Sequence, residues 1–226
     1  MDIQLNRQVI LDKIHGCWLG KNMGGTIGGP YEGKRELLDI RGFTNQKGEP
    51  LPNDDLDLQL VWLLALETVG AKTLTANELA DYWLSYIAPH WNEYGVAKAN
   101  LRMGFLPPLS GALYNEKWKT SNGAWIRSEL WACLAPGFPN IAVKYAIMDA
   151  SIDHGLSEDT HAEVFTAVLE SLAFFESDIR KLIETALTYI PADSMITSAV
   201  RLVLACYDQN IPGSRPGRKS WRRSSL

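Results

Sequence analysis

The sequence predicts an all-α protein that folds as a single-domain helical bundle. Apolar residues recur at three- and four-residue steps over most of the chain. No stretch shows the sustained alternation of apolar and polar residues that a half-buried strand requires. The chain has 226 residues, of which 46% are hydrophobic and 21% charged, so it is long enough to enclose one large core.

The sequence predicts a series of helices separated by loops. The first covers residues 9–19. The glycine-rich residues 20–33 either extend it as a tightly packed helix, whose small residues allow another backbone to approach and which ends at Gly29-Pro30, or form a flexible loop. Asn53 is a good N-cap and Gly70 a stop signal, which predicts a helix between them. Recurring glycine and proline make residues 91–123 an expected irregular region. The remaining predicted helices cover residues 77–87, 124–134, 140–153, 158–176, 178–188 and 192–206.

Composition and charge narrow the class of protein. The net charge is −4, yet residues 211–226 hold five basic residues and no acidic one, so residues 1–210 carry 17 basic against 26 acidic side chains. Such an acidic body argues against nucleic-acid binding. No apolar run approaches the roughly 20 residues of a membrane helix, so no membrane contact is expected. The three scattered cysteines lack a C-x-x-C pair and favour a reducing compartment, with the cytoplasm as the expected location.

Asn53-Asp54-Asp55 is the strongest local signal for chemistry. Adjacent carboxylates at the start of a helix can hold one hard cation or two neighbouring ones. The alternative is that these acids only complement the helix dipole, which is common in a first turn.

Three other residues have both a functional and a structural interpretation. His154 ends a predicted helix and either acts in catalysis or is a satisfied, partly buried side chain. Arg127 either grips a phosphate or pairs with Glu129 or another acid. Glu32 follows a Gly-Gly-Pro-Tyr sequence and is either functional or an ordinary exposed glutamate. The sequence lacks the motifs of serine acyl transfer and of zinc hydrolysis.

Taken together, four segments resemble the ADP-ribosylglycohydrolase family. KIHGCWLGKNMGGTIGGPYEG resembles the opening helix of that family, which ends in Gly-x-Pro-x-Glu. NDD stands where the family carries Ser/Thr-Asp-Asp, NGAWIR resembles its Gly-(x)-(Met/Ile)-Arg loop, and DASIDH resembles its helix that ends in Thr/Ser-x-His. The resemblance covers residues 11–207, and the fuller forms of these segments resemble a less studied branch of the family.

The resemblance implies an orthogonal helical bundle that hydrolyses N- or O-glycosidic bonds to ADP-ribose or a related nucleoside-glycosyl group. It implies two magnesium ions, with a ligand set from Asn53, Asp54 and Asp55. Glu32 would gate the site or activate water, together with Asp55 as a catalytic carboxylate. The implied substrate-binding residues, which would contact an ADP-ribosyl small molecule or an ADP-ribosylated acceptor, are Asn122, Gly123, Ala124, Arg127 and His154.

The chain departs from the family pattern in two places. Asn53 replaces the usual hydroxyl residue, and the second ligand motif, Asp-x-Asp-Thr/Ser, does not follow the histidine-bearing helix. The basic residues 211–226, which are expected to be disordered or frame-shifted, follow the helical domain of residues 1–210 abruptly. This change favours a truncated or frame-shifted product over a nucleic-acid-binding tail. We therefore expect a weak or partial magnesium site, impaired hydrolysis and self-association through apolar faces of Ile196, Val200, Leu202 and Leu204. The alternatives are an ADP-ribose-binding pseudoenzyme and a structural family member without catalysis.

Overall fold

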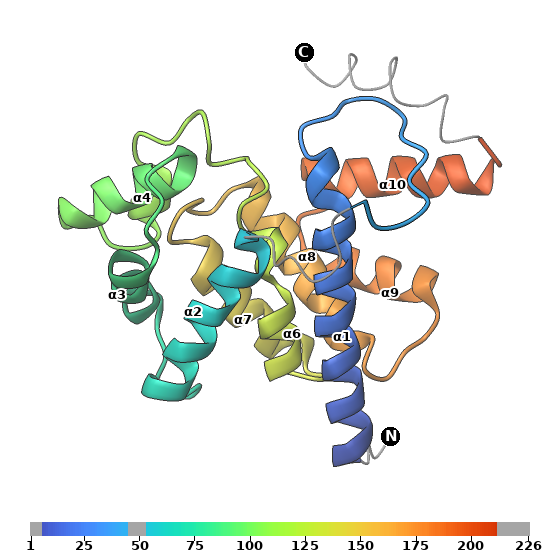
Figure 1. Ribbon diagram of the computed structural model, residues 1–226, viewed down its shortest axis with the longest axis horizontal. Coiled ribbons are helices and arrows are strands. Elements are labelled where there is room, and N and C mark those ends of the chain that lie inside the picture. The colour runs from blue at the N-terminus through green and yellow to red at the C-terminus, as the bar shows by residue number, and fades with distance from the viewer. Residues whose placement is uncertain (1–5, 45–52, 212–226) are drawn as a thin grey trace.

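The predicted all-α fold is confirmed by a computed structural model that describes residues 6–44 and 53–211 (Figure 1). No residue in these two ranges belongs to a strand. The α-helices are α1 (Arg7–Gly28), α2 (Asp54–Val69), α3 (Ala76–Tyr86), α4 (Asn92–Arg102), α5 (Leu109–Ala112), α6 (Glu129–Leu134), α7 (Pro139–Ala150), α8 (Glu158–Leu172), α9 (Ile179–Ala186) and α10 (Met195–Asp208). The described ranges also contain the short 3-10 helices η1 (Gly29–Tyr31), η2 (Trp125–Arg127) and η3 (Leu187–Tyr189). Among the helices described, none has the length and apolar character needed to cross a bilayer.

Helix α8 lies at the centre of the molecule. It packs against α6, α7, α9, α10 and η2, and Figure 1 shows it between the α6–α7 pair and the α9–α10 pair. Two of its buried apolar residues, Val164 and Val168, are four positions apart and belong to the main hydrophobic core. This spacing places both side chains on one face, which is why the sequence pattern identifies the helix.

Stacked aromatic side chains fill part of the main hydrophobic core. Trp62 of α2 stacks on Trp83 of α3 with ring centroids 5.8 Å apart, and Tyr94 of α4 meets Trp83 edge-on at 5.3 Å. Trp131 of α6 stacks on Tyr145 of α7 at 5.5 Å. These contacts join α-helices that follow one another along the chain, and each contributes on the order of 1 kcal/mol beyond simple burial.

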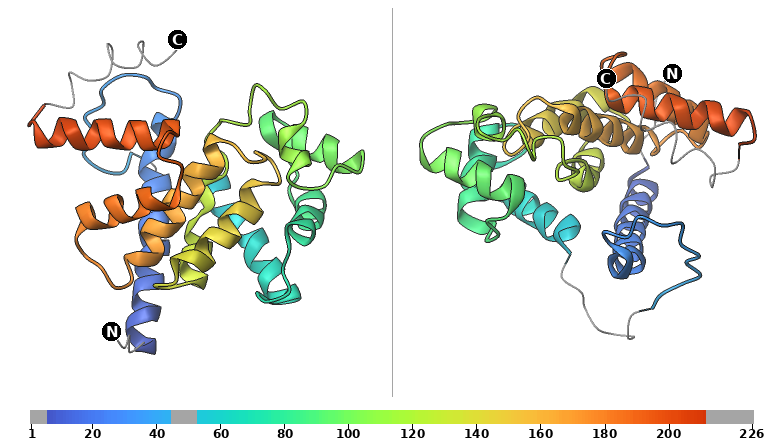
Figure 2. Two further views of the ribbon diagram at one scale, coloured as in Figure 1. Left: turned by 180° about the vertical axis from the view of Figure 1, so that it is seen from behind. Right: turned by 90° about the horizontal axis from the view of Figure 1, so that it is seen from above.

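Helix α1 continues through the glycine-rich segment, so the flexible-loop alternative is wrong. It begins at an Asn6 side chain that accepts the backbone N–H groups of Gln8 and Val9, and η1 follows its last residue, Gly28. None of its residues is buried, and Figure 2 shows it standing out from one side of the layer formed by α7, α8 and α10. The expected close approach of another backbone is not found along α1. A Cβ atom would meet no atom within 4 Å at Gly16, Gly20, Gly24 and Gly28, and at Gly25 the close neighbour is the Asn53 side chain.

The expectation that residues 91–123 are irregular is wrong at its start, where α4 forms. Its buried side includes the polar residues Glu93, Lys98 and Asn100, so apolar periodicity does not identify the helix. Gly95 is required there, since a Cβ atom would lie 2.1 Å from the carbonyl oxygen of His90. After Arg102 the chain is indeed mainly turns, interrupted by α5.

Helix α10 presents a different apolar face from the expected one. Ile196, Val200 and Leu204 are partly buried against the core, whereas Val203 and Tyr207 are 66% and 78% exposed. Leu202 is 44% exposed, as expected for an outward-facing residue. The basic residues 212–226 lie outside the described residues.

Candidate functional site

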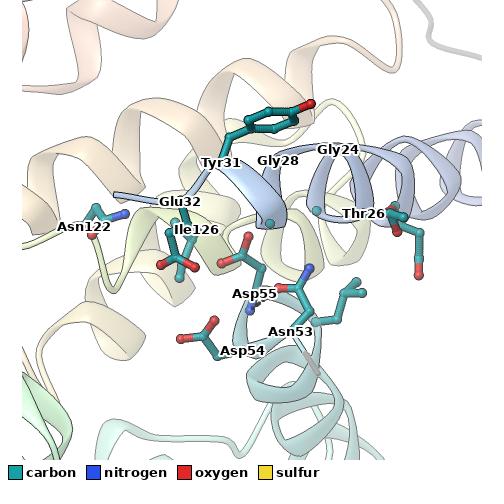
Figure 3. Close-up of a pocket in the computed structure, with 14 residues that line it drawn as sticks. Gly24, Thr26, Gly28, Tyr31, Glu32, Asn53, Asp54, Asp55, Asn122 and Ile126 are labelled. Atoms are coloured by element: carbon teal, nitrogen blue, oxygen red, sulfur yellow. Dashed lines mark hydrogen bonds between the residues drawn. The ribbon is translucent and has the colours of Figure 1, made fainter. Parts of the chain in front are cut away.

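An acidic cleft of about 520 Å³ opens between the end of α1, the start of α2 and the turn before η2. Figure 3 shows the carboxylates of Glu32, Asp54 and Asp55 turned toward the same space. The acidic cleft is lined by Asn22, Gly24, Gly25, Thr26, Gly28, Gly29, Tyr31, Glu32, Asn53, Asp54, Asp55, Leu56, Asn122 and Ile126.

The first turn of α2 holds its two cleft carboxylates in fixed positions. The Asn53 side chain caps this helix, and its Oδ1 atom accepts the backbone N–H of Asp55 at 3.0 Å. The Tyr94 hydroxyl donates to Oδ2 of Asp54 at 3.2 Å. Gly25 of α1 faces the cap closely, since a Cβ atom on it would lie 2.0 Å from Nδ2 of Asn53. The two helices therefore meet at the cap, and a glycine is needed on α1 at that point.

The surroundings of Asp55 shift its protonation equilibrium. Burial raises its pKa, the neighbouring carboxylates of Asp54, Glu129 and Glu32 raise it further, and Lys21 opposes them. Lys21 lies 2.8 Å from Oε1 of Glu129 and donates to the carbonyl oxygen of Ile126. A half-buried carboxylate with a raised pKa binds a proton more readily than an exposed one, which is a useful property in a general base.

A second set of charges lies beneath the acidic cleft and is closed to solvent. The buried charge cluster consists of Arg127, Asp149, Asp153, His154 and Asp159. The Arg127 guanidinium donates through Nε to Asp149 at 2.8 Å and through Nη2 to Asp153 at 2.7 Å. Its third nitrogen donates to the carbonyl oxygen of Gly123 at 2.6 Å. Arg127 is 0% exposed, so in this structure its hydrogen-bonding capacity is directed to the protein interior.

His154 lies between two carboxylates in the same cluster. Its Nδ1 atom is 2.9 Å from Oδ1 of Asp153, and its Nε2 atom is 3.0 Å from Oδ2 of Asp159 and 3.1 Å from the Ser121 hydroxyl. Burial alone would lower the pKa of His154, but the carboxylates of Asp153 and Asp159 raise it. Burial would raise the pKa of Asp153, but Arg127 and His154 lower it to about 2. The cluster therefore favours a protonated imidazole beside an ionised Asp153.

The segment from Ser121 to Ala124 connects the two sets of residues. Asn122 lines the acidic cleft, whereas Gly123 and Ala124 are buried, and the backbone N–H of Ala124 donates to Oδ2 of Asp159 at 2.7 Å. At Gly123 a Cβ atom would lie 2.6 Å from Oε1 of Glu93 and 2.9 Å from the His154 ring. The buried charge cluster thus holds this segment at both its backbone and its side chains.

The residues expected at the site fall into two groups. Glu32, Asn53, Asp54, Asp55 and Asn122 meet in the acidic cleft. Gly123, Ala124, Arg127 and His154 lie below it and are buried. Of the two interpretations of Arg127 given above, the structure shows ion pairing with other acids, Asp149 and Asp153, instead of Glu129.

Sequence reasoning missed three residues that shape these groups. Lys21 and Tyr94 support the cleft carboxylates, and Asp159 supports His154 and Ala124. The signal for Asp159 was its place in the first turn of a helix just after His154. Within the ranges that the structure describes, no group of three or more His, Cys, Asp or Glu side chains is gathered closely enough to hold a metal ion.

The fold and the site define an all-α protein with a carboxylate-lined cleft above a buried charge cluster. A family model described as ADP-ribosylglycohydrolase matches residues 6–223. Because this match covers nearly the whole sequence, the chain belongs to the ADP-ribosylglycohydrolase family. No curated protein and no solved structure matched the chain.

Proposed function

We propose that this chain hydrolyses N- or O-glycosidic bonds to ADP-ribose, or to a related nucleoside-glycosyl group, in the acidic cleft. The observation that carries the proposal is the convergence of Glu32, Asp54 and Asp55 on one cleft in a chain of this family. Glycosidic hydrolysis passes through a transition state with positive charge on the sugar, and nearby carboxylates stabilise such charge. The expected substrates are ADP-ribosyl small molecules or ADP-ribosylated acceptors.

In the proposed reaction, Asp55 or Glu32 removes a proton from an attacking water. The water oxygen forms a bond to the anomeric carbon of the ribose, the bond from that carbon to the acceptor nitrogen or oxygen breaks, and the acceptor leaves with a proton. As long as no Mg²⁺ binds its carboxylate, the raised pKa of Asp55 suits this role, because a base works best when its pKa lies near the working pH. Glu32, which is exposed at the end of η1, would shield or assist the same water.

We further propose that Arg127 and His154 act as positioning residues for the substrate-facing segment. Arg127 holds the carbonyl oxygen of Gly123 and His154 contacts Ser121, so both act on the backbone that carries Asn122. The Ala124 N–H is already bonded to Asp159, which leaves the Asn122 side chain as the exposed polar group of this segment. The phosphate groups of the substrate would meet a surface that the buried charge cluster shapes from below.

Magnesium fits this site only in part. Asp54, Asp55 and the amide of Asn53 supply oxygen ligands on one side, but the described residues contain no three-residue group able to hold an ion. Oδ1 of Asn53 is also engaged as a helix cap. The two-ion arrangement implied by the family is therefore proposed here as a weak, partial Mg²⁺ site. Calorimetric titration of Mg²⁺ into the wild type and an Asp54→Ala, Asp55→Ala variant tests it, and equal heats from both proteins would restrict these acids to capping the helix.

The hydrolase proposal is tested by release of ADP-ribose from arginine-linked and serine-linked model substrates in magnesium buffer. We expect Glu32→Gln and Asp55→Asn to lower kcat by about 10²-fold or more. Asp57→Asn is the matched control, because Asp57 is another first-turn acid of α2 but lies outside the acidic cleft. It should change kcat less than about 2-fold. Equal losses in all three variants would contradict the assignment of the cleft.

Binding without catalysis is a second candidate, favoured by the burial of Arg127 and His154. In that case calorimetry would detect ADP-ribose binding that Asp55→Asn changes, while the wild type releases no product from either substrate. A purely structural family member would show neither.

A further inference from the structure

Two of the three cysteines lie across the contact between α1 and α6. Cys17 is on α1 and Cys133 on α6, and both are half-buried free thiols. The Lys21–Glu129 ion pair fixes the register of these two helices, which pack against each other. Cys17 lies one turn before Lys21 and Cys133 one turn after Glu129, so an antiparallel pair places the thiols on facing surfaces.

The surroundings of the two thiols make them chemically unequal. Hydrogen bonding between them lowers the pKa of Cys17, with burial and Glu129 opposing and Lys21 assisting. The same hydrogen bond, together with burial, raises the pKa of Cys133. Cys17 also lines a groove of about 220 Å³ with Lys13, Glu170 and Phe174, so a small reagent can reach it. Accessible thiols with thiolate character are the ones that react with disulfides.

We propose that Cys17 and Cys133 form a modification site that reacts with low-molecular-weight disulfides and closes into a disulfide between α1 and α6. The Cys17 thiolate attacks one sulfur of glutathione disulfide and expels a glutathione thiolate, which forms a mixed disulfide. Cys133, after losing its proton, attacks the Cys17 sulfur and expels the second glutathione thiolate. One glutathione disulfide is reduced to two glutathione molecules, and two protein thiols are oxidised to one disulfide.

Closure of this disulfide would restrain one wall of the acidic cleft. Helix α1 contributes Gly24, Gly25 and Thr26 to that wall, yet none of its residues is buried. Its polar attachments to the rest of the molecule include Lys21 and Lys13, which donates to the carbonyl oxygen of Ala173 at 3.1 Å. A covalent bond at Cys17 would lie between these two attachments and limit separation of α1 from α6. This chemistry is independent of the proposed hydrolysis.

The test is incubation of the reduced full chain with glutathione and glutathione disulfide at rising ratios. Remaining thiols are alkylated, and cross-linked peptides are identified by mass spectrometry without reduction. The wild type and the control Cys206→Ser should yield the Cys17–Cys133 peptide. Cys17→Ser and Cys133→Ser should not yield it at any ratio, with far-ultraviolet circular dichroism showing that both variants remain helical.

A second measurement follows the restraint of α1 by amide hydrogen exchange. Oxidation of the wild type should slow exchange across residues 7–28 by about tenfold or more, and it should leave Cys17→Ser unchanged. Absence of the Cys17–Cys133 peptide at ratios that oxidise a vicinal dithiol control would overturn the proposal. Unaltered exchange in the cross-linked protein would overturn the restraint of the cleft wall.

Discussion

At the scale of single residues, the arrangement around Arg127 and His154 depends on charge pairing in a buried space. Arg127, Asp149, Asp153 and His154 are each 0% exposed, so removing one charge leaves the others without compensation. Burial raises the pKa of Asp159 to about 6, although His154 and the Ala124 N–H act in the opposite direction. Protonation of this group therefore changes within a range that titration experiments reach easily.

Asp159→Asn should lower the pKa of His154 and alter the pH dependence of stability. The asparagine oxygen can still accept the Ala124 N–H, but the negative charge beside Nε2 of His154 is lost. The pKa of Asp159 is about 6 in the folded protein and 3.8 in the unfolded chain. Its contribution to stability is therefore largest below pH 3.8 and is lost as the pH rises to about 6.

The pKa of His154 is measured by NMR titration of the imidazole, and stability by urea unfolding at several pH values. The free energy of unfolding of the wild type should fall between pH 3.8 and 6 as Asp159 loses its proton. In the Asp159→Asn variant this fall should be smaller. An unchanged pKa of His154 would show that Asp159 does not act on the imidazole.

Among the helices, α1 has poor intrinsic stability and makes one close contact through a glycine. It contains five glycines, each of which costs about 1 kcal/mol relative to alanine in a helix interior. Only at Gly25 would a Cβ atom meet a neighbour within 4 Å among the glycines of α1, and that neighbour is the amide of Asn53. Adjacent glycines on the same helix therefore have opposite roles.

Gly24→Ala and Gly25→Ala form a matched pair that separates these roles. Gly24→Ala should stabilise the chain by up to about 1 kcal/mol, because it improves helix propensity and meets open space. Gly25→Ala should displace the Asn53 amide and cost about 1 kcal/mol through loss of the α2 cap. Urea unfolding monitored by circular dichroism measures both. Stabilisation of similar size by the two substitutions would contradict the contact between Gly25 and Asn53.

Individual helices show how far the sequence predicts the structure. The helix from Asn53 to Gly70 was predicted well because its cap and stop residues act locally. Helix α4 was not predicted, since its buried face includes Glu93 and Lys98, whose placement depends on surrounding elements. The family motifs led to Glu32, Asp54 and Asp55, which meet in one cleft. The sequence does not predict the burial of Arg127, because its partners are Asp149 near the end of α7 and Asp153 in the turn after it, and no local pattern links them to Arg127.

At the scale of the whole molecule, the buried charge cluster joins η2, the end of α7 and the start of α8. Arg127 also lies over the ring of Trp83, 5.2 Å from its centroid, so the cluster adjoins the aromatic core. Stability of the complete fold should therefore depend on this arginine much more than on an exposed one.

Arg127→Met should reduce the free energy of unfolding by about 3–5 kcal/mol, because Asp149 would remain buried without its cation and Asp153 would keep only His154. The control is Arg180→Met, which removes exposed ion pairs with Glu184 and Asp208 and should cost less than about 1 kcal/mol.

Asp153 has a pKa lowered to about 2, so its stabilising contribution in the wild type is present above pH 3.8 and is lost as the pH falls to about 2. The deficit of Arg127→Met, measured by urea unfolding, should shrink over that range. Equal effects of the two substitutions would contradict a structural role of the cluster.

The outer face of α10 is expected to promote self-association. Val203 and Tyr207 are four positions apart and are among its most exposed large hydrophobic residues. Val203→Glu should shift sedimentation velocity profiles toward the monomer at high protein concentration, because it places a charge in an apolar contact. Thr188→Glu, on an exposed polar site of η3, is the control. A wild-type chain that sediments as a monomer at all concentrations would contradict this expectation.

Heating is expected to act on α1 before it acts on the rest of the molecule. A helix with no buried residue and five glycines separates from its neighbours at a small cost in free energy, whereas the stacked tryptophans hold the core together. On warming, the acidic cleft would lose one wall while the core remains folded. Thermal inactivation would then occur at a lower temperature than the loss of the near-ultraviolet circular dichroism signal of the aromatic core. The working temperature of this protein would be set by its least buried helix.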